Sequence, residues 1–475
     1  MPPVSSVRFG TDGWRAVIGE DFTFNNVRLV SQATADYFQR RQARTTKKLI
    51  VIGFDRRFLS NEFAEAVAEV LAGNGYKVVL SHSPVPTPAV SWLVAKLKGR
   101  AGVMVTASHN PARFNGIKLK LHHGGPADSD TCRSVETSIG QRPVKKMLLE
   151  KARAKMMLKV QNFKTRYFNA LRRMVDFKLI ATSGLRFAHD ALYGVGAGCF
   201  EELLEETNCE VRTFNAEHDP NFGGICPEPI ERNYTSSRAA LQTEPADFCL
   251  VTDGDADRIG GMDGRGNALT THQIICLLLE HFLKNRQGSG RVVKALTTTS
   301  MVDVMCARHQ LPLTVTGVGF KYICMEMLKA DVLLGFEESG GVGFPKHVPE
   351  RDGILAGLMI LELLASEGKP LTKLLNRLTV NYGPHEYGRI DTDFPLDRSS
   401  ELMNQAAKHP PADLLGSPLD KIETFDGVKY TARNGCWLML RGSGTEPVLR
   451  IYAEAPTRGG VENLLRQGQS ISDRI

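Results

Sequence analysis

Three aspartates alternate with small residues in the segment Thr252-Asp-Gly-Asp-Ala-Asp-Arg258. Carboxylates held this close repel one another unless a cation lies among them. Because hard cations such as Mg²⁺ prefer carboxylate oxygens, we predict that Asp253, Asp255 and Asp257 bind Mg²⁺. A calcium-binding EF-hand loop also begins D-x-D-x-D, but it needs glycine at its sixth position and glutamate at its twelfth, where this segment has arginine and glycine. An acidic turn without an ion is the alternative.

A serine hydroxyl lies in the segment Thr106-Ala-Ser-His-Asn-Pro111. Ser108 is a candidate nucleophile, but a free serine is weak and needs a base, a metal or prior modification, and the adjacent His109 need not point at it. Lys118 adds an amine that could act as an acid or base if its pKa is lowered. The alternatives are a simple Ser/Asn/Pro turn and a surface lysine.

Two glycine-rich segments complete the chemical inventory. In Gly335-Phe-Glu-Glu-Ser-Gly-Gly341, carboxylates and a hydroxyl are suited to accepting hydrogen bonds from vicinal sugar hydroxyls, although an ordinary acidic turn is the alternative. In Arg441-Gly-Ser-Gly-Thr-Glu-Pro-Val-Leu-Arg450, backbone N–H groups with Arg, Ser and Thr donors could cradle a phosphate. The segment lacks G-x-x-x-x-G-K-[ST], so a nucleotide P-loop is not indicated.

The elements that must position these segments alternate between strands and helices. Apolar runs predict strands, three of which run directly into a chemical segment, and a strand-like run precedes the last segment: 49–54, 77–80, 101–105, 248–252, 332–335, 428–432 and 436–440. Helical periodicity predicts helices at 61–73, 88–97, 273–284 and 353–366. Open α/β sheets bind ligands at the carboxyl ends of their strands, which is where these segments lie. From Pro384 onward the sequence becomes more acidic and polar, and we predict a smaller α+β unit there.

Length and composition agree with a globular multidomain protein. The 475 residues correspond to about three or four domains, with 42% hydrophobic and 23% charged residues. The sequence shows no apolar run long enough for a membrane span and no secretory signal at its start, so we expect a cytoplasmic protein. Nine scattered cysteines without a C-x-x-C pair favour reduced, partly buried thiols over a zinc or redox site.

Positive charge is concentrated between Gln141 and Lys178. This segment contains 12 Lys or Arg and two acidic residues, a net charge of +10, whereas the whole chain carries +7, so the other residues sum to −3. Apolar residues spaced three and four apart in 145–175, at Leu149, Ala152, Met156, Val160, Phe163, Tyr167 and Leu171, predict one or two amphipathic helices. A solvated helix face explains the charge better than a nucleic-acid or membrane surface, because the basic face lacks interleaved aromatic residues.

Taken together, the four segments describe phosphoryl transfer on a phosphosugar. The chain resembles the α-D-phosphohexomutase family over nearly its whole length, from Phe9-Gly-Thr-Asp-Gly-Trp-Arg15 to the Arg441 loop, and within it the phosphoglucomutase and phosphomannomutase branch. The resemblance implies three related α/β domains, expected at 1–160, 161–266 and 267–378, and a C-terminal α+β domain at 379–475, arranged around a central cleft.

The resemblance also implies roles for individual residues. Ser108 matches the serine phosphorylated in the resting enzyme, and its phosphate completes the Mg²⁺ site of Asp253, Asp255 and Asp257. The positions implied to act in catalysis beside Ser108 are Arg15, His109, Lys118 and Arg258, with Lys118 as the candidate general acid or base. Glu337 and Ser339 match the pair that reads the sugar. The residues implied to hold the non-reacting phosphate are Arg441, Ser443, Gly444, Thr445 and Arg450.

The implied activity is a Mg²⁺-dependent isomerase that moves a phosphoryl group within a hexose phosphate. Glu337-Glu-Ser339 looks closest to glucose-preferring members, so we expect glucose 1-phosphate and glucose 6-phosphate to interconvert through glucose 1,6-bisphosphate. Mannose or glucosamine phosphates are the alternative substrates, and a non-catalytic binding or regulatory protein is the alternative class. The expected partner is a phosphosugar rather than nucleic acid or membrane, and the chain could be a monomer or a dimer.

Overall fold

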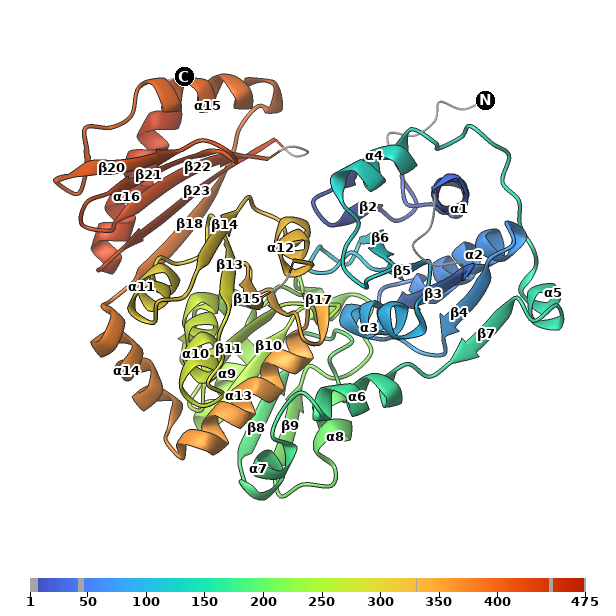
Figure 1. Cartoon of the computed structure of the whole chain (residues 1–475), viewed down its shortest axis with the longest axis horizontal. Coiled ribbons are helices and arrows are strands. Elements are labelled where there is room, and N and C mark those ends of the chain that lie inside the picture. The colour runs from blue at the N-terminus through green and yellow to red at the C-terminus, as the bar shows by residue number, and fades with distance from the viewer. Residues whose placement is uncertain (1–6, 42–46, 330, 444–446, 474–475) are drawn as a thin grey trace. The chain divides into compact units, whose positions relative to one another are not determined.

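The computed structural model describes residues 7–41, 47–329, 331–443 and 447–473. The described residues form two compact units, one within 1–289 and 319–372 and the other within 290–318 and 373–475. Alternating strands and helices fill the first unit, and an antiparallel sheet dominates the second (Figure 1). Among the described residues, no helix is long and apolar enough to cross a membrane.

The largest sheet of the first unit has seven strands in the order β1-β2-β6-β5-β3-β4-β7. Its strands are β1 (Phe9–Gly10), β2 (Gly13–Val17), β3 (Leu49–Phe54), β4 (Lys77–Ser81), β5 (Ala101–Val105), β6 (Phe114–Leu121) and β7 (Leu158–Gln161). The four strands β5, β3, β4 and β7 are parallel, whereas β6 pairs antiparallel with both β5 and β2. The antiparallel turn from β5 back into β6 places the serine segment at the carboxyl end of β5.

Helices cover both faces of this sheet. They are α1 (Phe24–Arg40), α2 (Ser60–Gly73), α3 (Thr87–Leu97) and α4 (Ser129–Glu136). Ile50 and Ile52 of β3 belong to the same buried cluster as α1 and α2 side chains, whereas a Cβ at Gly53 would meet Val90 of α3. This alternation follows from the two-residue period of a strand.

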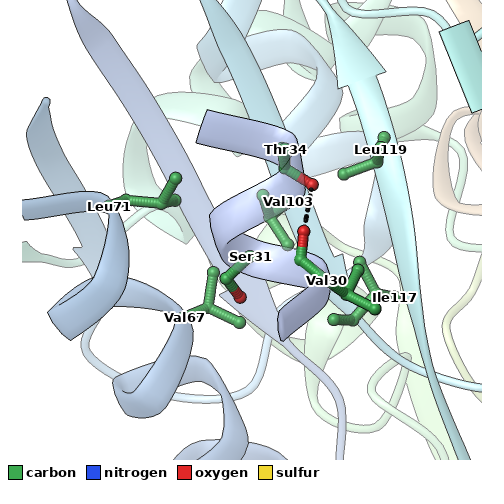
Figure 2. A pocket seen from close by; sticks show the side chains of 8 residues that line it. All are labelled: Val30, Ser31, Thr34, Val67, Leu71, Val103, Ile117 and Leu119. Carbon is green, nitrogen blue, oxygen red and sulfur yellow. Dashed lines mark hydrogen bonds between the residues drawn. The ribbon is translucent and has the colours of Figure 1, made fainter. Parts of the chain in front are cut away.

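The core between α1, α2 and the sheet is closed by small branched side chains. Figure 2 shows Val67 of α2 next to Ser31 of α1, and Val30 of α1 next to Ile117 of β6, while Leu71 and Val103 also line this part of the core. The hydroxyl of Thr34 donates to the backbone oxygen of Val30 at 2.8 Å, so this polar group is satisfied within its own helix.

Two further groups of strands belong to the first unit. A five-stranded sheet has the order β12-β11-β10-β8-β9 and consists of β8 (Arg186–Asp190), β9 (Glu210–Phe214), β10 (Phe248–Thr252), β11 (Ile259–Asp263) and β12 (Ala268–Leu269). The antiparallel strands β15 (Val332–Phe336), β16 (Val342–Phe344) and β17 (Val348–Arg351) follow later in the chain. The remaining helices of this unit are α5 (Leu149–Ala154), α6 (Lys164–Arg172), α7 (Phe177–Thr182), α8 (Cys199–Leu204), α9 (Thr235–Thr243), α10 (Thr271–Lys284), α12 (Phe320–Met327) and α13 (Gly353–Glu367).

The second unit contains a six-stranded antiparallel sheet in the order β18-β23-β22-β21-β20-β19. Its strands are β18 (Glu386–Asp393), β19 (Asp413–Leu414), β20 (Ser417–Glu423), β21 (Val428–Ala432), β22 (Trp437–Gly442) and β23 (Val448–Ala455). Helices α15 (Ser399–Lys408) and α16 (Arg458–Ser472) share its buried apolar cluster. The parallel pair β13 (Arg291–Ala295) and β14 (Leu313–Thr316) and the helices α11 (Met301–Arg308) and α14 (Leu371–Tyr382) complete the chain.

The predicted strands and helices are confirmed, as is the smaller α+β unit near the C-terminus. The helical interpretation of 145–175 is wrong in its middle, because β7 separates two short helices there. Met156, assigned to a buried helix face, is 84% exposed, and Val160 lies in β7, which pairs with β4. All nine cysteines are free thiols, each buried or half-buried.

Candidate active site

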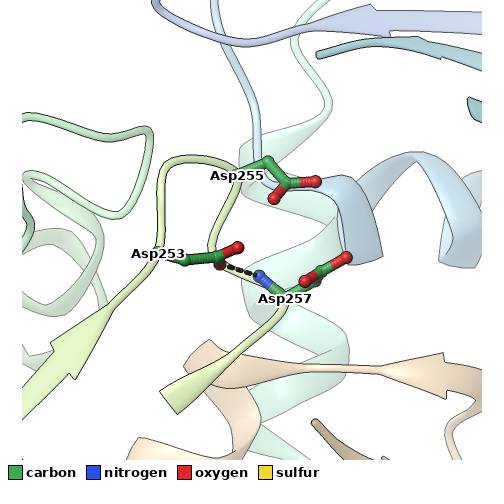
Figure 3. Close-up of side chains that lie close together, drawn as sticks. All are labelled: Asp253, Asp255 and Asp257. Atoms are coloured by element: carbon green, nitrogen blue, oxygen red, sulfur yellow. Dashed lines mark hydrogen bonds between the residues drawn. The ribbon is translucent and has the colours of Figure 1, made fainter. Parts of the chain in front are cut away.

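The three aspartates of the metal segment are fully buried at the carboxyl end of β10. One carboxylate oxygen from each of Asp253, Asp255 and Asp257 lies within 4.8 Å of the others (Figure 3). The loop is folded around Asp253, whose Oδ1 accepts from the backbone N–H groups of Asp257 at 3.0 Å and Arg258 at 3.1 Å. The carboxylates are therefore held together by local backbone geometry.

These residues fit a hard divalent cation. The Oδ1 atoms of Asp255 and Asp257 are buried without a hydrogen-bond partner, which is costly for a carboxylate. Burial, followed by the charges of Asp255 and Asp257, raises the pKa of Asp253 well above its ordinary value. A bound cation would supply a partner for the two unpaired oxygens and would favour the ionised form of Asp253. We call these three residues the aspartate cage.

The serine segment reaches this cage from β5. Ser108 is buried, and its Oγ donates to Oδ2 of Asp253 at 2.7 Å. Its backbone has a φ of 52°, a left-handed conformation that is strained for a residue with a side chain. The hydroxyl is thus aimed at the metal segment rather than at solvent.

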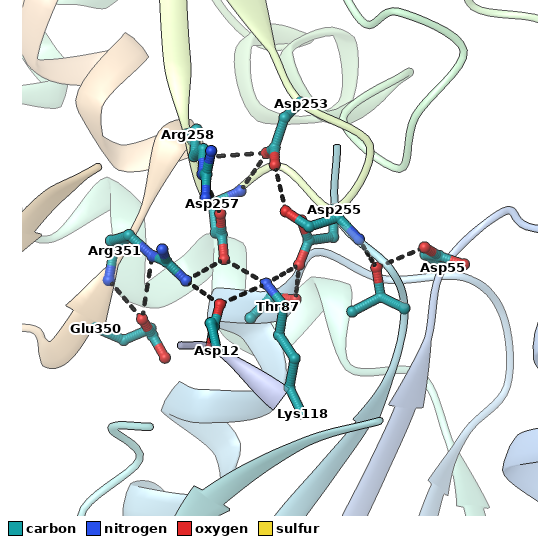
Figure 4. A network of polar contacts seen from close by, with 12 residues as sticks. Asp12, Asp55, Thr87, Lys118, Asp253, Asp255, Asp257, Arg258, Glu350 and Arg351 are labelled. Atoms are coloured by element: carbon teal, nitrogen blue, oxygen red, sulfur yellow. Dashed lines mark hydrogen bonds and ion pairs between the residues drawn. The ribbon is translucent and has the colours of Figure 1, made fainter. Parts of the chain in front are cut away.

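Lys118 comes from β6, the strand that returns beside β5. Its Nζ contacts Asp255 and Asp257 at 2.8 Å each and Asp12 at 3.0 Å (Figure 4). Burial lowers the pKa of Lys118, but Asp12, Asp255 and Asp257 raise it by more, so its pKa lies above the ordinary value. A surface lysine is excluded, and in this arrangement Lys118 is a protonated donor rather than a base.

Two other predicted residues, Arg15 and Arg258, give the site its positive character, and His109 lies among these cations. Arg15 donates through Nη1 to Oδ1 of Asn110 at 2.6 Å, and the Nε of Arg258 lies 3.9 Å from Oδ1 of Asp257. Burial, then the charges of Arg258, Arg15 and Lys118, lowers the pKa of His109 well below its ordinary value. His109 is therefore a neutral imidazole in a cationic setting, which suits the binding of an anion.

The predicted sugar-reading glutamate is joined to the metal segment by Arg351. Glu337 follows β15 and accepts from Nη1 of Arg351 at 3.2 Å, while Nη2 of the same guanidinium contacts Asp257 at 2.8 Å and also Asp12. Ser339 is half-buried in the turn between β15 and β16. One buried arginine thereby connects the Glu337 turn with the aspartates.

The predicted phosphate-clamp residues belong to the second unit. Arg441 and Arg450 are opposite each other on β22 and β23, with Arg441 paired to Asp426 at 3.0 Å and Arg450 placed 3.7 Å from Asp391. The backbone N–H of Ser443 donates to the oxygen of Val448 at 2.9 Å. Gly444 and Thr445 lie outside the described residues.

Sequence reasoning assigned no role to Asp12, Thr87 or Arg351. Asp12 bridges Lys118 and Arg351, and the Thr87 hydroxyl donates to Oδ2 of Asp255 from the start of α3. Asp12 belongs to the Phe9–Arg15 motif, which indicated that this segment matters but gave no role for the aspartate. The other two carry no local signal, because only the fold brings them to the aspartates.

A buried serine, an aspartate cage and surrounding cations define a site suited to phosphoryl transfer, and the comparisons with known proteins agree with that class. Four families match in order: phosphoglucomutase/phosphomannomutase alpha/beta/alpha domain I at 6–144, domain II at 165–266, domain III at 270–382 and the C-terminal domain at 401–467. The chain belongs to this phosphoglucomutase/phosphomannomutase family, within the α-D-phosphohexomutase superfamily. Its four-domain α/β architecture follows.

Individual relatives carry different sugar names. The chain is 28% identical to a phosphoglucomutase/phosphomannomutase of Thermococcus kodakarensis, over 97% of each chain. It is also 28% identical to a phosphoglucosamine/phosphogalactosamine mutase of Sulfurisphaera tokodaii, over 98% of each. A crystal structure of a candidate phosphomannomutase from Thermus thermophilus superposes with a TM-score of 0.86 at 34% identity, covering 98% of this chain and 99% of that one. The comparisons therefore establish the family, but the names of the relatives do not agree on one sugar substrate.

Proposed function

We propose that this chain is a Mg²⁺-dependent phosphohexomutase that interconverts glucose 1-phosphate and glucose 6-phosphate. The observation that carries the proposal is the 2.7 Å hydrogen bond from Ser108 to Asp253 of the buried aspartate cage. It puts a nucleophile beside a cation site, and a serine needs such an activating neighbour.

The reaction has two matched half-reactions. In the first, the P–O bond between phosphorus and the Ser108 oxygen breaks while a new P–O bond forms to the free hydroxyl of the hexose monophosphate. The hydroxyl proton is lost and a proton returns to Ser108, giving the serine and glucose 1,6-bisphosphate. In the second, the Ser108 oxygen forms a bond to the other phosphorus while the bond from that phosphorus to the sugar oxygen breaks. The serine proton is lost and the sugar oxygen gains a proton, which restores the phosphoserine and releases the isomeric monophosphate.

Each polar group near Ser108 has a role in this scheme. Asp253, Asp255, Asp257 and the phosphorylated Ser108 would hold Mg²⁺, which when bound neutralises charge on the transferring phosphoryl group. Lys118, protonated in this structure, supplies a proton or hydrogen bond to an oxygen of the reacting groups. Arg15, Arg258 and neutral His109 surround the phosphoryl group with donors and positive charge.

Substrate recognition is assigned to the other two segments. Glu337 and Ser339 accept hydrogen bonds from sugar hydroxyls, with Glu337 oriented by Arg351. Arg441, Ser443, Gly444, Thr445 and Arg450 hold the phosphate that does not react. The sequence Glu337-Glu-Ser339 favours glucose, while the relative named for glucosamine and galactosamine phosphates keeps an amino sugar as the second candidate.

Initial rates on glucose, mannose and glucosamine 1-phosphates, with Mg²⁺ and a bisphosphate primer, test this proposal beside Ser108→Ala. We expect the highest kcat/KM with glucose 1-phosphate and no turnover in the variant. Preference for another sugar would keep the mechanism and change the substrate. Absence of turnover with every primed sugar would favour a binding protein, and full activity of Ser108→Ala would refute the nucleophile.

A further inference from the structure

Arg57 is a fully buried arginine that lies outside the phosphoryl-transfer scheme above. It follows β3 by three residues, and its side chain is inaccessible to solvent, as is that of Asp55. The two form an ion pair with 3.2 Å between Nε of Arg57 and Oδ2 of Asp55. A buried arginine of this kind is expensive unless its donors are used.

The guanidinium donates to four backbone carbonyls of the loop that carries Ser108. Nη2 reaches the oxygens of Ser108 and Asn110 at 2.6 Å each, and Nη1 reaches those of Pro111 at 2.9 Å and Phe114 at 3.1 Å. These carbonyls span the whole turn from β5 into β6. A planar fork of N–H donors can serve four acceptors at once, which a lysine ammonium cannot do in this geometry.

The partner carboxylate holds the other side of the same loop. Asp55 accepts from the Thr106 hydroxyl at 2.6 Å and from the Ser60 hydroxyl at 2.7 Å. The Thr106 oxygen in turn accepts from the backbone N–H of Ser108 at 2.8 Å. The peptide groups on both sides of Ser108 are therefore fixed, its N–H through Asp55 and Thr106 and its carbonyl by Arg57.

This bracing explains how Ser108 keeps a strained backbone. Its φ of 52° costs about 1–2 kcal/mol for a residue with a Cβ, so an unbraced loop would relax. Relaxation would rotate Oγ away from Asp253. The Cζ of Arg57 also lies 4.8 Å from the centre of the Phe222 ring, and this cation–π contact helps to hold the plane of the guanidinium.

We propose that Arg57 is the positioning residue that orients Ser108 toward the aspartate cage for phosphoryl transfer, acting through the backbone of 108–114 without touching the substrate. This inference rests on the proposed function for its catalytic consequence. Its structural part, that Arg57 orders this loop, stands independently.

The test compares Arg57→Lys with Arg100→Lys in the full-length protein. Arg100 is the matched control, because it is also buried and donates to backbone carbonyls, those of Phe38 at 2.6 Å and of Arg41. We expect Arg57→Lys to lower kcat about 100-fold, as a displacement of about 1 Å would, with the KM for the sugar phosphate within about twofold of wild type. Arg100→Lys should leave both constants within about twofold of wild type.

Hydrogen exchange supplies a readout that does not depend on turnover. In Arg57→Lys, the amides of 108–114 should exchange about tenfold faster, while the amides of β3 and α2 keep their protection. Thr106→Val, a milder change that removes the link between Asp55 and Ser108, should move the same amides and kcat in the same direction. It preserves the test if Arg57→Lys fails to fold.

The outcomes separate the two claims. Unchanged exchange in 108–114 and unchanged kcat in both variants would overturn the positioning role. A rise in KM without a fall in kcat would overturn it as well, because that pattern indicates lost binding. If the wild-type protein turned over no sugar phosphate, the proposed function would fail, and the exchange comparison would still decide whether Arg57 orders the loop.

Discussion

Gly254 stands between Asp253 and Asp255 where the metal loop meets the serine loop. A Cβ built on Gly254 would lie 2.5 Å from the backbone oxygen of Ser108 and 3.1 Å from Cγ of Pro227. Gly254 has no positive φ, so alanine is compatible with its backbone conformation and the conflict is one of contact alone. Gly254→Ala therefore pushes the two loops apart without removing any functional side chain.

The size of the displacement follows from the contact distance. Ordinary van der Waals contact begins at 3.4 Å, so the Cβ and the Ser108 oxygen must separate by 0.9 Å (3.4 − 2.5). The backbone N–H of Gly254 donates to the oxygen of Pro227 at 3.2 Å, and the Gly254 oxygen accepts from the N–H of Val195 at 3.1 Å, so the metal loop is anchored. The serine loop is anchored by Arg57, which donates to the oxygens of Ser108 and Asn110 at 2.6 Å each. A misplacement of about 1 Å costs about 100-fold in rate, which is about 2.7 kcal/mol of activation free energy.

The assay measures kcat for glucose 1-phosphate at saturating Mg²⁺ and bisphosphate in Gly254→Ala. The matched control is Gly459→Ala, because a Cβ on Gly459 in α16 meets nothing within 4 Å. We expect kcat to fall about 100-fold in the first variant and to stay unchanged in the second. Wild-type kcat in Gly254→Ala would refute the claim that the close approach of the two loops sets the rate.

Three further predictions concern metal affinity, a buried ion pair and acid stability. Thr87→Val removes the hydroxyl that orients Asp255, so the Mg²⁺ affinity measured by calorimetry should fall about 10–100-fold, and an unchanged affinity would contradict this role. Lys120 of β6 and Glu350 of β17 form an ion pair whose side chains have no solvent exposure. Lys120→Met should lower the free energy of unfolding, measured in urea, by about 3–5 kcal/mol, and adding Glu350→Gln should recover part of that loss. Losses that simply add in the double variant would argue against coupling between the two residues. Burial lowers the pKa of His189 to about 3, below its unfolded value of 6.5, so its protonation favours the unfolded chain as pH falls. Wild type should therefore lose about 2 kcal/mol relative to His189→Gln between pH 7.5 and 5, and parallel pH profiles would count against this effect.

The strands and their loops were predictable because the signals are local. The apolar run 248–252 is followed directly by Asp253, so the point at which the strand ends is also the point at which the candidate metal ligands begin. The apolar spacing wrongly predicted that Met156 lies on the buried face of a helix. The chain instead forms a short helix that ends at Ala154, a turn that exposes Met156, and a strand that begins at Leu158. Spacing alone does not reveal the point at which the chain changes conformation.

The supporting contacts of the site could not be predicted, because they arise between residues far apart in the sequence. Arg351 ends β17, and it meets Asp12 and Asp257 only once this strand and two separate loops are folded together. The role of Lys118 likewise depended on the fold, since burial among carboxylates decides that it is protonated. Sequence patterns indicate which groups are present, whereas tertiary packing determines their charge state and orientation.

The proposed mechanism depends on Ser108 carrying the transferring phosphoryl group. Intact-protein and peptide mass spectrometry after incubation with glucose 1,6-bisphosphate and Mg²⁺ examines that step itself. We predict that wild type, first dephosphorylated with excess glucose 6-phosphate and desalted, gains one phosphoryl group on Ser108 from the bisphosphate. After a second desalting it should lose that group on addition of glucose 6-phosphate, and Ser108→Ala should gain none. A phosphoryl group on another residue, or turnover without any phosphorylated enzyme, would contradict the mechanism.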